Sequence, residues 1–355
     1  MATIFRLNQL ARRGMVFALT VAGGMSAPAA MAAGNIWLTS ADIGLLRSQP
    51  ARTAALMQRC DKEIDVQAAP VAVFAPPAHY SKTGVVENAM AKRFDSDGGV
   101  AFRAGLCYAV SQDMRYAQHA QAMISAWADT LQSVPSEQGA SDINFDLPQY
   151  VIAASMVRNV HGWNDASFRR LLTRIALPLS HSDRKNNHAN WGVFLNASIA
   201  AYTGDVALLA SSRARWLELM DSEVAPDGSL PLEICRSDNN NYCGGDRKGI
   251  NGLSYTHYTL LPTTAAARLF DLQGQAVWHT PQGNKLAAAY RAAAAWTLRP
   301  ETFPYYQSNG GHLNGVYNAA YFTLLQRQFP NADGGQVIAN GKLGMNALEW
   351  VAVFQ

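Results

Sequence analysis

The chain has 355 residues, with 29 Lys or Arg, 26 Asp or Glu and a hydrophobic fraction of 49%. Three of the basic residues are the only charged residues before position 34, so the rest of the chain has 26 basic and 26 acidic residues and no net charge. This balance excludes a global positive field for nucleic acid or a membrane surface. An acidic ligand must then be bound by local cations.

Residues 1–33 predict a secretory signal peptide. They begin with Arg6, Arg12 and Arg13, continue with an apolar run at 15–24, and end with Ala30-Met31-Ala32, a small-x-small cleavage pattern. The apolar run is too short to span a bilayer, and no later stretch is long enough. We therefore expect an exported protein without membrane insertion, periplasmic or secreted, whose mature part is a single domain over residues 34–355.

The four cysteines are Cys60, Cys107, Cys235 and Cys243. An even number in an exported chain predicts two disulfides. Cys235 and Cys243 are the nearest pair and would close a small loop, and Cys60–Cys107 would then tie two early helices together. There is no Cys-x-x-Cys pair, so the sequence predicts neither a metal site nor a cofactor.

Apolar residues recur at helical spacing along most of the chain, and no run alternates convincingly at a period of two. One helix is expected to open at Phe145, with Pro148 in its first turn. About a dozen helices joined by short turns predict an all-α fold, an α/α toroid (an incomplete α/α barrel), with an irregular bundle as the alternative. Besides the helix described next, the predicted helices lie at residues 40–62, 102–110, 116–134, 145–160, 168–178, 206–224, 260–272, 285–298, 317–328 and 344–354.

Residues 184–191 (RKNNHANW) are the densest polar stretch, with two cations, three amides, an imidazole and an indole. They run directly into an apolar helical pattern that ends near Gly204. Asn186 or Asn187 is expected to cap this helix, so the polar groups would lie at its positive N-terminus, which favours a bound anion such as a sugar carboxylate. Taken alone, the asparagines are only a cap and His188 is more often a core histidine.

Two further polar stretches lie between residues 226 and 262. The first ends in Glu233, Cys235 and Arg236, so a Cys235–Cys243 disulfide would fix the backbone that carries Arg236. The second places Tyr255 and Tyr258 three residues apart, on one face at the start of a helix. Taken alone, the tyrosines are core aromatics and Arg236 is a surface ion-pair partner.

Together these stretches resemble the alginate lyase superfamily, and within it the mannuronate-type enzymes of polysaccharide lyase family 5. The residues that carry the resemblance are Asn186-Asn187-His188 with Trp191, Asp227-Gly228-x-x-Pro231-x-Glu233-x-x-Arg236, Leu253-x-Tyr255-x-x-Tyr258-x-Leu260-x-Pro262, and Ser81-Lys82. The chain departs from the family at Ala189-Asn190, where an aromatic pair is usual, and at the loop 237–249. A sister family, such as glucuronan or other polyuronate lyases, is therefore the alternative.

The resemblance implies β-elimination on an anionic polysaccharide, with His188, Tyr255, Asn187 and Arg236 as catalytic residues. Asn187 and Arg236 would neutralise the uronate carboxylate, a task for which Arg247 and Lys248 compete with Arg236 because of the loop. In mannuronate the C5 proton and O4 lie on one face, so Tyr255 would act as base and then as acid, assisted by His188. On guluronate His188 would be the base and Tyr255 the acid.

The same resemblance implies a set of residues that hold the polymer. Lys82 would contribute a cation, and four aromatic side chains would stack on sugar rings at flanking subsites. These four are Trp191, Tyr258, Tyr150 and Tyr80. We expect the enzyme to be a monomer.

Two other readings of the sequence compete with a lyase. An inverting glycoside hydrolase on an α/α barrel would use Asp146 and Glu233 as its acid and base. A non-catalytic polyuronate-binding protein would keep the aromatic and cationic groups but would not need both His188 and Tyr255. The densest polar group contains Asn, His, Tyr and Arg rather than carboxylates, which favours the lyase.

Overall fold

The structure is a computed structural model, and it describes residues 35–81, 84–85, 88–160, 162–238, 242–341, 343–344 and 349–354. By its contacts the chain divides into residues 1–30 and 31–355, and the second part is one compact unit. The predicted signal peptide lies outside the described residues. Within the described residues, every helix is too short or too polar to cross a membrane.

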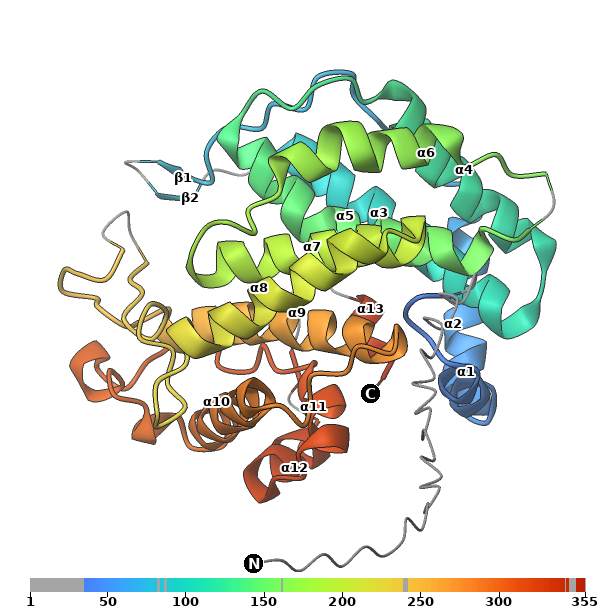
Figure 1. The fold of residues 1–355 in the computed structure, drawn as a ribbon. Helices are drawn as coiled ribbons and strands as arrows, with labels where there is room; N and C mark the ends of the chain where they lie inside the picture. Colours follow the sequence, from blue (N-terminus) through green and yellow to red (C-terminus); the bar gives the residue numbers. More distant parts are fainter. Residues whose placement is uncertain are drawn as a thin grey trace, which may run out of the picture. The chain divides into compact units, whose positions relative to one another are not determined.

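The described residues form helices and one two-stranded hairpin, which confirms the all-α prediction (Figure 1). The hairpin pairs β1 (Tyr80–Ser81) with β2 (Gly84–Val85) in antiparallel fashion. The helices are α1 (Ser40–Arg47), α2 (Pro50–Glu63), α3 (Ala89–Ser111), α4 (Met114–Thr130), α5 (Glu137–Val157), α6 (Ala166–Leu171), α7 (Asn186–Thr203), α8 (Val206–Glu223), α9 (Gly252–Leu272), α10 (Pro281–Leu298), α11 (Phe322–Gln328), α12 (Ala332–Ala339) and α13 (Glu349–Ala352).

The central helices alternate between an inner row and an outer layer. Helix α5 packs against α3 and α7, and α7 packs against α9, so every second helix joins the inner row. Helices α4 and α8 connect neighbouring members of the row and pack against them, and α10 follows α9 and packs against α9 and α8. This alternation is the pattern of an α/α toroid, as predicted.

Burial follows from the sequence of each helix. In α7, a run of alanine, glycine and large apolar residues, only Asn186, His188 and Thr203 are not buried. A helix that is apolar on all sides belongs in a core. In α8 the buried residues recur every three or four positions, as expected for an outer helix with one inward face.

Several predicted helix limits are wrong. The expected helix 40–62 is two helices, because Pro50 starts a new one at a position where its missing N–H costs nothing. Helix α5 begins before Phe145, after an N-cap at Ser136, so Pro148 lies in its interior and not in its first turn. Helix α9 begins at Gly252 and not at residue 260, which places Tyr255 in its first turn. Helix α12 was not predicted.

Both predicted disulfides are present. Cys60 of α2 bonds to Cys107 of α3, and Cys235 bonds to Cys243 within the loop between α8 and α9. The first joins two neighbouring helices. The second closes a loop that reaches the candidate site.

Candidate active site

The predicted site residues meet where the first turns of α7 and α9 approach the loop between α8 and α9. At Gly252, the first residue of α9, a Cβ atom would lie 2.0 Å from the carbonyl oxygen of Ile234. This close approach brings the segment that carries Arg236 against the first turn of α9. The hairpin β1–β2 reaches the same place, because the hydroxyl oxygens of Tyr80 and Tyr255 are 2.6 Å apart.

The start of α7 is occupied by carboxylates of the protein itself. The N–H group of Asn186 donates to Glu223 Oε1 at 2.5 Å, and that of Asn187 donates to Glu233 Oε1 at 2.8 Å. Asn186 has a positive φ of 61°, and its side chain accepts from the N–H of His188 at 3.1 Å. The expectation that this helix end binds the anion of a sugar is therefore wrong for its first turn, where protein groups already accept these N–H bonds.

Glu233 orients Asn187. Its Oε1 accepts hydrogen bonds from the backbone N–H and the side-chain Nδ2 of Asn187 and from the hydroxyl of Thr259, at 2.8, 3.0 and 3.1 Å. Its burial raises the pKa of the carboxyl to about 7, although Arg236 and these hydrogen bonds act in the opposite direction. The carboxylate therefore connects the start of α7 to α9 and to Arg236.

Arg236 is the cation beside Tyr255. Its guanidinium carbon lies 4.2 Å from the ring centroid of Tyr255 and 3.9 Å from that of Tyr242, and its Nε lies 3.3 Å from Glu233 Oε2. The two competing cations have other partners. Arg247 pairs with Asp238 at 3.1 Å, and Lys248 lies 5.5 Å from the ring of Tyr305.

Tyr255 is partly exposed, and its hydroxyl is shared with Tyr80. Burial, and after it the neighbouring Tyr80, raise the pKa of the Tyr255 phenol, whereas the guanidinium of Arg236 lowers it. The phenol is protonated at neutral pH. It can donate a proton directly, and it needs added positive charge to give one up and act as a base.

His188 is neutral at neutral pH. Burial, His181 and the guanidinium groups of Arg184 and Arg236 lower its pKa to about 4. Its Nδ1 is buried and has no hydrogen-bond partner among the described residues. One of the two ring nitrogens of a neutral imidazole carries no proton, so the ring is able to accept one.

His181 lies next to His188. No role was predicted for it from the sequence. The two ring centroids are 5.4 Å apart, and His181 is only 2% exposed. Neither of its ring nitrogens has a hydrogen-bond partner among the described residues, and Nε2 is 4.0 Å from Glu137 Oε1. Its backbone N–H donates to Asn144 Oδ1 at 3.0 Å, so α5 fixes its position. Sequence spacing carries no signal for this contact between α5 and the turn before α7.

Two of the predicted sugar-stacking residues are core residues. Trp191 is 1% exposed and packs against Phe145 and Tyr258, with ring centroids 5.5 and 5.2 Å away. Tyr150 is fully buried and donates to the carbonyl of Phe94 at 2.6 Å. Both predictions are wrong, because these side chains point into the helix packing.

The remaining predicted ligand-binding residues have different outcomes. Tyr258 is partly exposed and lies 6.3 Å from Tyr255, measured between ring centroids. Tyr80 is 37% exposed. Lys82 lies outside the described residues. Tyr80 and Tyr258 thus both lie beside Tyr255.

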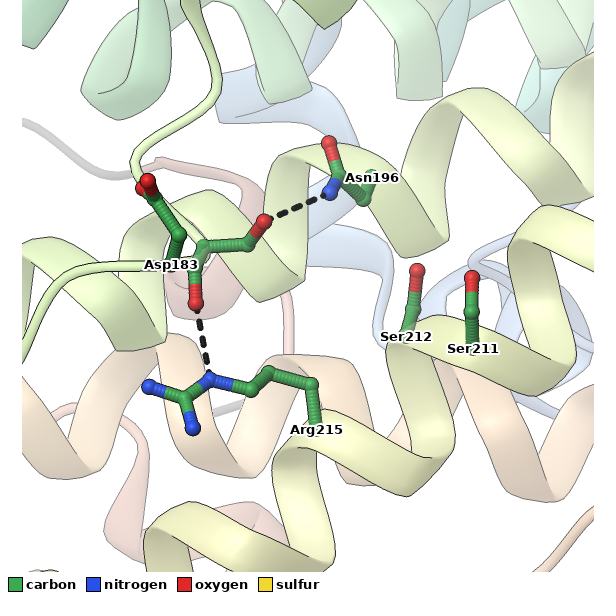
Figure 2. A pocket seen from close by; sticks show the side chains of 6 residues that line it. Asp183, Asn196, Ser211, Ser212 and Arg215 are labelled. Carbon is green, nitrogen blue, oxygen red and sulfur yellow. Dashed lines mark hydrogen bonds between the residues drawn. The ribbon is translucent and has the colours of Figure 1, made fainter.

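A pocket of about 240 Å³ lies between the turn before α7 and helix α8 (Figure 2). At its wall, Arg215 Nε donates to the carbonyl of Ser182 at 2.9 Å, and Asn196 Nδ2 donates to Ser182 Oγ at 3.1 Å (Figure 2). These bonds hold the turn that carries His181. The described residues contain no group of three or more His, Cys, Asp or Glu side chains arranged to hold a metal ion.

Comparisons with known proteins agree with this architecture. The family model described as alginate lyase matches residues 55–303. No curated protein sequence matches the chain. Among solved structures, an alginate lyase from Bacteroides ovatus superposes with a TM-score of 0.70 at 14% identity, over 91% of this chain and 99% of that one.

Two structures of another enzyme are also similar. Alginate lyase A1-III from Sphingomonas species A1 has a TM-score of 0.61 at 17% identity, over 80% of this chain and 88% of that one. A histidine-to-alanine variant of alginate lyase A1-III, complexed with a tetrasaccharide, has a TM-score of 0.64 at 15% identity, over 90% and 93%. At these identities the likeness shows a common fold.

Proposed function

The chain belongs to the alginate lyase family and is a polysaccharide lyase, and from this premise we propose that it cleaves mannuronate-rich alginate by β-elimination. The reaction removes the C5 proton of a β-1,4-linked uronate and expels the O4 oxygen, so that an unsaturated uronate end forms. The observation that carries the proposal is the meeting of Arg236, Tyr255 and the Glu233–Asn187 pair at one place.

Neutralising the carboxylate is the larger task. The C5 proton is weakly acidic until the adjacent carboxylate is neutralised, and preorganised donors and cations supply this electrostatic stabilisation. We assign it to Arg236 and to the second hydrogen of Asn187 Nδ2, since the backbone N–H of Asn187 and the first hydrogen of Nδ2 are donated to Glu233. The hydrogen bonds and ion pair of Glu233 hold both in place before substrate arrives, so little reorganisation is needed in the transition state.

Tyr255 is our candidate for proton transfer. In mannuronate the C5 proton and O4 lie on the same face, so one phenol can take the first proton and give one to the leaving oxygen. Arg236, 4.2 Å from the ring centroid, favours the phenolate that this route requires. We assign the assisting role to the neutral His188.

One observation favours a second substrate, guluronate. The low pKa of His188, about 4, keeps its imidazole neutral, as a base requires. The raised pKa of Tyr255 keeps its phenol protonated, as an acid requires. In that route His188 takes the C5 proton and Tyr255 protonates O4 from the opposite face. Glucuronan remains the alternative polymer of a sister family.

The contacts of Glu233 argue against an inverting glycoside hydrolase. An inverting hydrolase needs one carboxylic acid and one carboxylate facing the scissile bond. Glu233 already accepts three hydrogen bonds from protein groups, and Arg236 lies beside its other oxygen. A protein that only binds the polymer would not require Arg236 to be held beside the Tyr255 phenol.

The test uses the purified protein on polymannuronate, polyguluronate and glucuronan, with the ultraviolet absorbance of the new double bond as the readout. We expect a rise on polymannuronate that is absent in Tyr255→Phe. A rise on polyguluronate alone would move the assignment to the His188 route. Reducing ends without a rise in absorbance would replace the lyase by a hydrolase.

We further propose that the enzyme acts as an exported monomer, periplasmic or secreted. Its two disulfides support an oxidising compartment. Sedimentation analysis of the purified protein and fractionation of the producing cells test the two parts of this proposal. A dimer, or enzyme confined to the cytoplasm, would contradict it.

A further inference from the structure

The loop closed by the Cys235–Cys243 disulfide has no assigned role, although it touches the site. We propose that Tyr242, on this loop, is a positioning residue that holds the guanidinium of Arg236 against Tyr255. The inference rests on the proposed function, since it names a residue that sets the geometry of the assigned carboxylate-binding arginine.

The guanidinium of Arg236 lies between two aromatic rings. Its carbon is 3.9 Å from the ring centroid of Tyr242 and 4.2 Å from that of Tyr255. Planar guanidinium groups stack well on aromatic faces, and the attraction grows as the groups are desolvated. Arg236 is nine-tenths buried and Tyr242 is 41% exposed, so this contact is partly desolvated.

Few other contacts set the orientation of this guanidinium. Glu233 Oε2 lies 3.3 Å from Nε, but the geometry is not that of a hydrogen bond, and Nε has no hydrogen-bond partner among the described residues. The charge of Glu233 attracts Arg236 without fixing its plane. The plane is therefore set by the rings of Tyr242 and Tyr255.

The hydroxyl of Tyr242 anchors its side chain. Its hydroxyl donates to the carbonyl of Leu232 at 3.0 Å and accepts from Asn186 Nδ2 at 2.9 Å, at the start of α7. Its side chain is nevertheless 41% exposed. Fixing an exposed tyrosine costs conformational entropy, and the two hydrogen bonds offset this cost.

The Cys235–Cys243 disulfide keeps Tyr242 and Arg236 close to each other. It joins the residue just before Arg236 to the residue just after Tyr242, and the carbonyl of Tyr242 accepts from the N–H of Ser237 at 3.2 Å. The disulfide thus adds a covalent link to the hydrogen bonds that keep Tyr242 over the guanidinium. The loop that interrupts the family pattern supports Arg236 in this way.

The first experiment measures kcat and KM of Tyr242→Leu and Tyr242→Phe on the polymer that the wild type cleaves. Misplacing a group by about 1 Å costs up to about 100-fold in rate, so we expect kcat of Tyr242→Leu to fall by about 10- to 100-fold while KM changes little. Tyr242→Phe keeps the stacked ring but loses both hydrogen bonds of the hydroxyl, so its kcat should lie between those of the wild type and Tyr242→Leu. Tyr317→Leu, at an equally exposed tyrosine beside Gly344, is the matched control and should keep wild-type kcat.

The outcomes separate positioning from other roles. A rise in KM with unchanged kcat would make Tyr242 a substrate contact and overturn the proposal. Equal losses in Tyr242→Leu and Tyr242→Phe would assign the effect to the hydroxyl and not to the stacked ring. Cys235→Ala/Cys243→Ala should reproduce the fall in kcat, whereas Cys60→Ala/Cys107→Ala should not change kcat per folded molecule.

A second measurement does not depend on activity. A double-mutant cycle of Tyr242→Leu and Arg236→Met in urea unfolding should show coupling of about two- to fivefold in the unfolding equilibrium constant, the size of a partly exposed cation–π contact. Additive effects would overturn the stacking. If the wild type cleaves none of the polymers, the proposed function fails while this cycle still decides whether Tyr242 holds Arg236.

Discussion

Glu233 and Asp142 are buried carboxylates with different surroundings. Glu233 accepts three hydrogen bonds, whereas Asp142 accepts one, from Gln138 Nε2 at 2.6 Å, and its Oδ2 has no partner among the described residues. Burial raises the pKa of Glu233 to about 7 and that of Asp142 to about 6. Proteins keep such destabilising groups mainly where function needs them.

Asp142 should therefore cost stability at neutral pH. Between pH 3.8 and about 6 the folded protein holds a proton that the unfolded chain has already released, so stability falls as pH rises through this window. Asp142→Asn removes this dependence. We expect it to raise the free energy of unfolding at pH 7.5 by on the order of 2 kcal/mol, and by little at pH 3.5.

Urea unfolding at the two pH values measures this difference, with Asp129→Asn at an exposed aspartate of α4 as the control. Equal gains at both pH values would show that the charge of Asp142 is not the cause.

His188 determines the acid limit of activity in the proposed mechanism. Its pKa of about 4 means that the imidazole stays neutral well below pH 6.5, the ordinary value. The pH dependence of kcat/KM reports the ionisation of the free enzyme. We therefore expect the ionisation of His188 to lower kcat/KM only as pH falls toward 4. Protonation of Glu233, whose pKa is about 7, weakens the support of Arg236 and adds a separate limb that Glu233→Gln removes, so a limb near 6.5 that persists in Glu233→Gln would contradict the assignment.

Arg184 offers the matched variant. Its guanidinium is one of the charges that lower the pKa of His188, and it pairs with Glu137. Arg184→Gln removes a nearby cation and frees a nearby carboxylate, and both changes favour the protonated imidazole. The acid limb of kcat/KM should move to higher pH in this variant.

At the scale of elements, α7 depends on one glycine. A Cβ atom at Gly192 would lie 2.2 Å from the backbone nitrogen of Ser182, so the turn that carries His181 rests directly on the helix. Gly192→Ala must push this turn away, and overpacking of this kind costs about 1–3 kcal/mol. We expect a lower melting temperature and a lower kcat, since His188 lies one turn earlier on the same helix.

Gly44→Ala in α1 is the control for this substitution. Nothing lies within 4 Å of a Cβ atom at Gly44, and the residue is inside a helix. Alanine there should stabilise the protein by about 0.5–1 kcal/mol. A Gly192→Ala enzyme as stable and active as the wild type would show that the turn moves freely.

The sequence predicted the presence of most helices but misplaced the ends that matter for the site. The apolar pattern predicted the body of α9 from Leu260, and Tyr255 and Tyr258 were expected near a helix start, but the start at Gly252 was not located. The turn is helical because Leu253 is fully buried and Gly252 allows the backbone of Ile234 to approach. Such tertiary contacts override local propensity and leave no periodic signal.

At the scale of the whole molecule, the site joins segments that are far apart in sequence. Motif order predicted Asn187, Arg236 and Tyr255 as site residues, and in the structure Glu233 contacts Asn187 and Arg236, and Arg236 lies beside Tyr255. The carboxylates at the start of α7 come from α8 and from the loop that follows it. The Tyr80–Tyr255 contact depends on the hairpin, and the His181–His188 pair depends on packing against α5. Only the folded arrangement of the helices determines these distances, so residue spacing alone could not predict them.

The two ends of the described chain are also joined, by Asp42. Its carboxylate accepts from Arg268 at 2.7 Å and from Arg327 at 3.2 Å, and Arg268 also donates to the carbonyl of Trp37. The indole of Trp37 donates to the carbonyl of Trp350 at 2.7 Å. Residues near both ends of the chain thus meet on α9.

Burial alone would raise the pKa of Asp42, but the hydrogen bonds from Thr39 and the charge of Arg268 outweigh it and lower the pKa below 3.8. The carboxylate therefore stabilises the fold at neutral pH, and this contribution is lost as pH falls through its lowered pKa. Asp42→Asn leaves Arg268 buried and unpaired, which costs about 3 kcal/mol when one partner of a buried pair is removed.

Urea unfolding at pH 7 should show this loss, while kcat per folded molecule stays at the wild-type value, because Asp42 makes none of the contacts of Arg236, Tyr255 or His188. A matched Asp205→Asn, at the N-cap of α8, should cost little, because asparagine caps a helix about as well as aspartate does. If Asp42→Asn lowered kcat as much as Tyr255→Phe does, the ends of the chain would be coupled to the site through α9, which carries both Tyr255 and Arg268.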